Sequence, residues 1–79
     1  MRYYFDLVDS EGIAIDEEGM ELPSIQSAQE EAARSLVDMA RDEFQPKRGA
    51  ARGLAIRVRD DTGPVLQLKF TFEVSRITD

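Results

Sequence analysis

The 79-residue chain contains neither cysteine nor histidine. Without cysteine, no disulfide supports the core and no thiolate can act as a nucleophile or metal ligand, which fits a reducing compartment. Without histidine, the chain lacks the commonest general base near neutral pH and the commonest zinc ligand. The serines have no imidazole to activate them, and no glycine-rich loop is suited to cradle a phosphate. We therefore expect neither an enzyme nor a protein with a cofactor or metal.

Long apolar runs are also missing. No run approaches the roughly 18 residues of a membrane span, and the first residues have the pattern of a strand instead of a signal peptide. We therefore expect a cytoplasmic protein that forms a single domain over residues 1–79 and does not bind a membrane. A chain of this size hides only about 60% of its surface on folding, so its core should be small.

Charged residues are abundant but unevenly distributed. The formal net charge is −6. Residues 1–46 carry twelve acidic and three basic side chains, whereas residues 47–79 carry four acidic and seven basic ones. The overall acidity argues against non-specific binding of nucleic acid, because that affinity comes from neutralising phosphates. The basic second part of the chain still permits a local patch.

The most periodic segment predicts a helix over about residues 24–44. Its apolar residues recur at helical spacing and form one stripe: Ile25, Ala28, Ala32, Leu36 and Met39. Ser24 or Ser27 can cap the first turn. Pro46 disfavours helical dihedrals in the residue before it, so the helix should end near Phe44.

Four segments have the patterns of strands. Residues 2–8 alternate polar and apolar side chains, and Ile13 with Ile15 can run back as a brief second strand. Residues 54–60 and 65–72 predict a third and a fourth strand that a hairpin loop joins.

The alternation also predicts which side chains face inward. These are Leu54, Ile56 and Val58 in the third strand and Leu66, Leu68, Phe70 and Phe72 in the fourth. Val65 is expected to face outward. Gly63 in the hairpin loop should adopt the positive φ that a turn with a bulge requires. We expect Leu36 and Phe70 to be buried where the helix packs on the sheet.

These elements predict an α+β fold of the order ββαββ, in which one long helix covers one face of a small antiparallel sheet. The expected spatial strand order is 2-1-3-4, with 2-1-4-3 as the alternative. Residues 46–53, which include two glycines and three positive charges, are expected to form an exposed, mobile loop. Residues 74–79 are expected to form a frayed tail.

The sheet face without a helix is the candidate interaction surface. We assign to it Tyr4, Arg57, Arg59 and Lys69. Asp6 should pair there with Arg57 or Arg59 across the strands. Our first hypothesis is a non-catalytic protein-interaction or self-associating module. The alternative is a nucleic-acid-binding or antitoxin-like regulator, although sheets that bind RNA usually present two or three stacking aromatic rings.

Acidic side chains crowd the segment before the helix. They are Asp9, Glu11, Asp16, Glu17, Glu18 and Glu21. Hard cations take several oxygens from one loop, but the pattern of an EF-hand is not matched here. We interpret these residues as solvated turn acids.

The edges of the predicted sheet bear on association. One outer strand should be a long hairpin strand, either residues 54–59 or residues 65–71, whose unpaired backbone groups can add a strand of a second chain. The pattern permits a monomer as well as a symmetric homodimer, and we favour the dimer.

Three segments resemble one family of short bacterial proteins. They are Arg-Tyr-Tyr-Phe at 2–5, Asp-Glu-Glu-Gly-Met-Glu-Leu-Pro-Ser at 16–24 and Ile-Arg-Val-Arg-Asp-Asp-Thr-Gly-Pro-Val-Leu at 56–66. Over nearly its whole length the chain is similar to an uncharacterised domain-of-unknown-function family found in rhizobia and related alphaproteobacteria. The resemblance implies a stand-alone cytoplasmic bacterial protein, and it assigns no activity and no functional residue.

Overall fold

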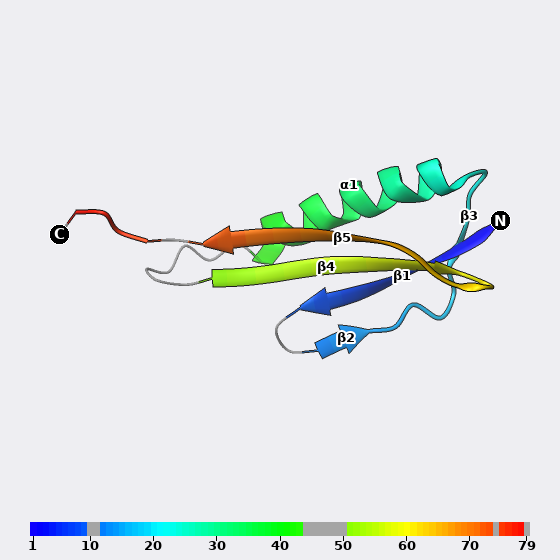
Figure 1. The fold of residues 1–79 in the computed structure, drawn as a ribbon, viewed down its shortest axis with the longest axis horizontal. Coiled ribbons are helices and arrows are strands. Elements are labelled where there is room, and N and C mark those ends of the chain that lie inside the picture. The colour runs from blue at the N-terminus through cyan, green and yellow to red at the C-terminus, as the bar shows by residue number, and fades with distance from the viewer. Residues whose placement is uncertain (10–11, 44–50, 74, 79) are drawn as a thin grey trace.

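The computed structural model describes residues 1–9, 12–43, 51–73 and 75–78. In this part of the chain there are one α-helix and five strands. The elements are β1 (Arg2–Asp9), β2 (Gly12–Ala14), β3 (Met20–Glu21), α1 (Ile25–Glu43), β4 (Ala51–Asp60) and β5 (Gly63–Glu73). All strand pairs are antiparallel, and α1 lies along one face of the sheet (Figure 1). The predicted α+β class is confirmed.

The sheet has the order β2-β1-β4-β5, which confirms the preferred strand order and excludes the alternative. At its centre β1 pairs with β4, and Leu7 lies opposite Ile56. The two-residue strand β3, which no pattern in the sequence predicts, pairs with Arg2 and Tyr3 at the start of β1. Since β2 pairs with the end of β1, β2 and β3 together form one interrupted edge of the sheet.

The helix begins at a cap that the sequence predicts. The Ser24 hydroxyl oxygen accepts a hydrogen bond from the Ser27 amide at 3.1 Å and so satisfies one amide of the first turn. The middle of the predicted apolar stripe is buried, but Ile25 at its start is 49% exposed, so the prediction was wrong there. Helical side chains lean toward the N-terminus, and that of the first helical residue therefore projects past the end of α1.

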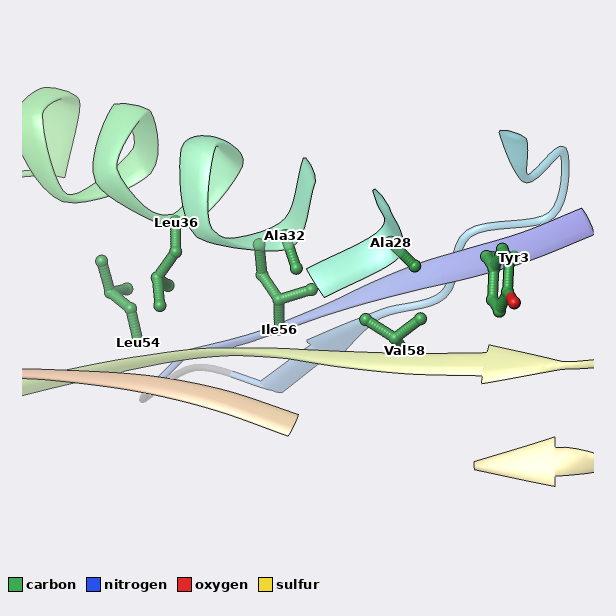
Figure 2. Packing of buried hydrophobic residues seen from close by; sticks show 7 residues of the cluster. All are labelled: Tyr3, Ala28, Ala32, Leu36, Leu54, Ile56 and Val58. Atoms are coloured by element: carbon green, nitrogen blue, oxygen red, sulfur yellow. The ribbon is translucent and has the colours of Figure 1, made fainter. Parts of the chain in front are cut away.

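The core lies between α1 and the central strands (Figure 2). It consists of Tyr3, Ala28, Ala32, Leu36, Leu54, Ile56 and Val58. Ile56 and Val58 are fully buried, which confirms the predicted inward side of the third strand. Ala28 and Ala32 present only methyl groups to the sheet, so the backbone of α1 can lie close above the large side chains of β4.

β5 departs from strict alternation near its hairpin. Val58 pairs with Leu66, whereas the next residue of β4 pairs with Pro64, so β5 has one extra residue at this point. This β-bulge turns Val65 toward the core, which it contacts, and the expectation that Val65 faces outward was wrong. Gly63 in the hairpin has the predicted positive φ, at 128°.

The outermost strand is less well covered than the sequence predicts. Leu36 is buried as expected, but Phe70 is 38% exposed, so the prediction of burial was wrong for Phe70. The reason is the position of β5 at the end of the sheet, where no further described strand lies beside it.

Some of the predicted boundaries shift. β4 begins at Ala51, because residues 51–53 pair with residues 71–73 of β5, so these three residues do not form the expected loop. Pairing between distant segments outweighs the local preference of glycine for loops. The rest of that loop, residues 46–50, lies outside the described residues. β2 ends at Ala14, which leaves Ile15 outside the strand. Residues 75–78 of the expected tail are exposed and belong to neither helix nor strand.

Candidate functional site

The sheet face opposite α1 carries the four residues of the candidate interaction surface. Tyr4 lies on β1, Arg57 and Arg59 lie on β4, and Lys69 lies on the outermost strand β5. Tyr4 and Arg59 are direct cross-strand neighbours. The Arg57 Nε atom donates a hydrogen bond to the side-chain oxygen of Gln67 at 2.8 Å. The fold therefore brings Tyr4 and Arg59 together but does not gather all four residues at one point.

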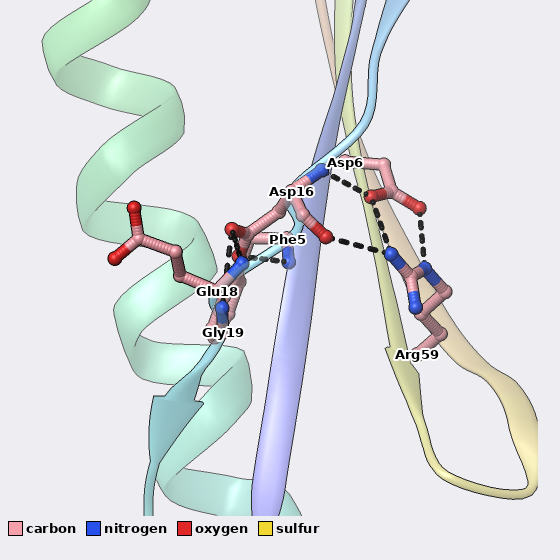
Figure 3. Close-up of polar contacts among 6 residues, drawn as sticks. All are labelled: Phe5, Asp6, Asp16, Glu18, Gly19 and Arg59. Carbon is pink, nitrogen blue, oxygen red and sulfur yellow. Dashed lines mark hydrogen bonds and ion pairs between the residues drawn. The ribbon is translucent and has the colours of Figure 1, made fainter.

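Arg59 is held by several contacts within the chain (Figure 3). Its Nε atom lies 3.0 Å from Asp6 Oδ2 in an ion pair, and its Nη2 atom donates to the Asp16 carbonyl oxygen at 2.7 Å. The guanidinium carbon lies 4.5 Å from the centroid of the Tyr4 ring, within cation–π range. The hydrogen bond to Asp6 raises the pKa of Arg59 above its ordinary value. The predicted pairing of Asp6 is thus confirmed for Arg59.

Asp6 is buried although it points away from the helix-covered face. It is 5% exposed, and the connection between β2 and β3 lies beside it at Asp16 (Figure 3). Besides the ion pair with Arg59, Asp6 Oδ1 accepts a hydrogen bond from the Asp16 amide at 2.9 Å. Asp6 therefore links β1 to β4 and to the connection that follows β2.

Asp16 fills the gap between the two pieces of the interrupted edge. Its Oδ2 atom accepts a hydrogen bond from the Phe5 amide at 3.1 Å, where neither β2 nor β3 pairs with β1. Its Oδ1 atom accepts hydrogen bonds from the Glu18 and Gly19 amides at 3.1 and 3.2 Å. The interpretation of all the early acids as solvated was therefore wrong for Asp16. An aspartate that opens a turn ending in glycine was the signal for this role.

Gly19 completes the same arrangement. Its φ is +72°, and a Cβ atom there would lie 2.9 Å from ring carbons of Tyr4 and from the Tyr3 carbonyl oxygen. Only glycine combines this dihedral with so close an approach. We call the five residues that these contacts join the anchor cluster: Tyr4, Asp6, Asp16, Gly19 and Arg59. Two residues of the predicted interaction surface thus serve to fix the connection between β2 and β3.

Replacement of Asp16 by asparagine tests the anchor cluster. An amide nitrogen cannot accept a hydrogen bond, so either the Phe5 amide or the pair of turn amides loses its partner. We expect D16N to lower the free energy of unfolding at pH 7 by about 1–3 kcal/mol, as measured by urea denaturation. The matched control E17Q changes an exposed neighbour and should stay within about 0.5 kcal/mol of the wild type.

The pH dependence of the same variant follows from the pKa of Asp16. Partial burial raises this pKa. Hydrogen bonds from the Phe5, Gly19 and Glu18 amides and the charge of Arg59 together lower it by more than burial raises it, so the pKa of Asp16 lies below its ordinary value of 3.8. A carboxyl with a lowered pKa stabilises the fold above pH 3.8 and loses this contribution as the pH falls through the lowered pKa. The difference in the free energy of unfolding between wild type and D16N should therefore shrink below pH 4. A difference that stays constant with pH would contradict the role of the ionised Asp16 carboxylate as the acceptor of these hydrogen bonds.

The outer edge of β5 is a second candidate surface. β5 is an end strand, and β4 is its only partner among the described strands. Of the two strands predicted as possible outer strands, residues 65–71 lie at the end of the sheet, whereas residues 54–59 lie between β1 and β5.

An open hollow of about 390 Å³ adjoins this edge. It lies between α1 and β5 and is lined by Val37, Ala40, Arg41 and Phe70. Val37 is 53% exposed and Phe70 is 38% exposed, so two large apolar side chains meet solvent beside backbone groups able to pair with another strand. The expected strand orders predict that one of the two long hairpin strands is outermost, but the exposure of these side chains depends on how α1 lies across β5.

The described part of the chain holds no group of three or more acidic, histidine or cysteine side chains arranged to bind a metal ion. In the same residues, no helix is both long and apolar enough to cross a membrane. Two features of the described residues are candidates for function: the sheet face with its anchor cluster, and the outer edge of β5 with its hollow.

The structure defines a small α+β domain built from one helix and an open antiparallel sheet. A family model described as "Domain of unknown function (DUF6894)" matches residues 2–71. The chain therefore belongs to this family, which confirms that it is part of an uncharacterised domain family. No curated protein and no solved structure has a significant match to the chain.

Proposed function

We propose that this is a small non-catalytic protein of the bacterial cytoplasm that associates with a second copy of itself through the outer edge of β5. One observation carries the proposal: the eleven-residue end strand β5 carries the exposed Phe70 and lies beside the exposed Val37 of α1. The cytoplasmic location is supported by the absence of cysteine from the sequence.

Two physical effects favour association at this edge. The outward amides and carbonyls of an end strand gain partners when another strand is added, and the added strand extends the sheet. Because Phe70 belongs to β5 itself, a strand that pairs with this edge also covers one side of the hollow and removes apolar surface from water. An isologous two-fold contact satisfies both copies at once and is the commonest form of oligomer.

Light scattering on a sizing column tests the proposal. At tens of micromolar, we expect a mass of about twice the 8.9 kDa of one chain, at low and at moderate salt. Backbone hydrogen bonds and apolar contacts are only weakly screened, so the dimer should persist as salt is added. A mass of 8.9 kDa under all these conditions would overturn the proposal.

A charge placed in the hollow should weaken the dimer without unfolding the chain. Val37 is exposed in the single chain, so V37E should leave the melting temperature nearly unchanged. In the dimer the same carboxylate would lie beside buried apolar surface, and the dissociation constant should rise about tenfold or more. The control Q29E adds the same charge two turns earlier on α1, outside the residues that line the hollow.

Nucleic-acid binding by an antitoxin-like regulator is the second hypothesis, and the contacts of the sheet face weigh against it. Arg59 already pairs with Asp6 and lies over the Tyr4 ring, so contacts within the chain already occupy its Nε and Nη2 atoms and that side of the ring. Lys69 and Arg57 remain exposed. Binding of a labelled single-stranded oligonucleotide at low salt, lost in R57A and K69A, would replace our proposal with this one.

A further inference from the structure

We infer that the two copies pair β5 with β5 about a two-fold axis that passes through Thr71, so that Lys69 of each copy faces Glu73 of the other. This inference rests on the proposed function and specifies the register of that interface. When the axis of an antiparallel pair passes through Thr71, a residue that precedes Thr71 in one copy faces the residue that follows Thr71 by the same number of positions in the other copy. The pair of Lys69 and Glu73 therefore occurs twice.

Two exposed charges on the outermost strand indicate this register. Lys69 and Glu73 alternate with Thr71 on the same face of β5, and both are exposed. Neither makes an ion pair with another described residue of its own chain. Because they lie four residues apart on one strand, they cannot face each other within one copy, but a second antiparallel strand can bring them together.

Other registers lose this charge match. An axis at Lys69 places the two lysines opposite each other, and an axis at Glu73 does the same with the two glutamates, which is unfavourable in either case. An axis at Leu68 places Lys69 opposite Gln67 and leaves Glu73 without an opposite charge. Only the axis at Thr71 pairs both charges, and it also places the exposed Phe70 opposite an aromatic side chain, Phe72 of the second copy.

Mixing two charge variants tests the pairing. K69E has glutamate at both positions and E73K has lysine at both, so each homodimer would face like charges twice, and its dissociation constant should rise about tenfold. In a mixed dimer every facing pair has opposite charges. An equimolar mixture of K69E and E73K should therefore form heterodimers with roughly the wild-type dissociation constant, detected by native mass spectrometry.

A matched pair of variants controls for overall charge. R34E and E30K make the same changes in net charge on the exposed face of α1, away from β5. Their mixture should show no preference for heterodimers over homodimers. A comparable preference in this control would overturn the pairing of Lys69 with Glu73, because long-range attraction alone would then explain the result.

Single cysteines locate the axis independently of affinity, since the chain has no cysteine of its own. Directly opposed residues of antiparallel strands have Cα atoms about 4.5–5.5 Å apart, which is within reach of a disulfide. T71C should therefore form a covalent dimer on mild oxidation. The control Q67C lies on the same face of β5, but its two copies would be about 27 Å apart and should not react.

These outcomes separate the register from the proposed function. A wild-type protein that stays at 8.9 kDa at all concentrations removes both. A wild-type dimer in which T71C does not cross-link overturns the axis at Thr71 and leaves self-association standing. A dimer in which T71C cross-links, Q67C does not and the charge variants prefer each other supports the register.

Discussion

Replacement of Ile56 by alanine is expected to lower the free energy of unfolding by about 2–5 kcal/mol. Ile56 is fully buried at the centre of β4, between Leu7 on β1 and Leu68 on β5. In Figure 2, Ala32 of α1 lies above Ile56, and its methyl group is too short to fill the cavity that the substitution leaves. Urea denaturation followed by circular dichroism measures the effect.

The control is the same change at an exposed site. Ile13 on β2 is 49% exposed, and I13A should cost less than about 1 kcal/mol. If I56A were no more destabilising than I13A, the core would not be centred on β4 as described. A loss of 2–5 kcal/mol is a large part of the roughly 5–15 kcal/mol that stabilises a typical domain, so I56A should be studied at low temperature and without urea first.

The parts of the fold that the sequence predicts are those fixed by periodicity and by local chemistry. The stripe of Ala28, Ala32 and Leu36 marks the buried face of α1, and Ser24 marks its start. Strict alternation in β4 identifies Ile56 as an inward residue. In each case neighbours in the sequence carry the information, so no knowledge of distant contacts is needed.

The parts of the fold that the sequence does not predict depend on distant contacts. β3 has two residues, too few to show a period, and it exists because β1 offers a partner. Val65 turns inward because a bulge forms where β5 pairs with β4, and Phe70 stays exposed because its strand ends the sheet. None of these features has a local pattern that sets it apart from an ordinary strand or turn.

The candidate site shows the same division. The four residues of the predicted surface do lie on the strands of the uncovered face, as alternation requires, and the pairing of Asp6 with Arg59 was anticipated. The role of Asp16 was not, since it depends on a gap in the pairing of β1 that only the folded chain creates. An acid in a polar turn looks the same in sequence whether it is solvated or holds an amide.

The second large effect is expected from Arg59. R59M removes the guanidinium but keeps a side chain of similar length, and it leaves the Asp6 carboxylate, which is 5% exposed, without its opposite charge. Breaking a buried pair in this way costs roughly 3–5 kcal/mol. The Arg59 side chain is 32% exposed, so water partly screens its attraction to Asp6. We therefore expect R59M to lower the free energy of unfolding by about 3 kcal/mol, the lower end of this range.

Urea denaturation of two further variants decides whether the uncompensated charge is the cause. R57M makes the same change at the exposed neighbouring arginine, whose partner is the neutral Gln67, and should cost less than about 1 kcal/mol. In the double variant D6N/R59M the side-chain oxygen of residue 6 can still accept the Asp16 amide, but no charge is buried. The double variant should therefore be more stable than R59M alone, by about 1–2 kcal/mol, because removing both charges costs less than leaving one unpaired. If D6N instead adds its own loss to that of R59M, Arg59 stabilises the fold through packing on Tyr4 and not through the Asp6 carboxylate.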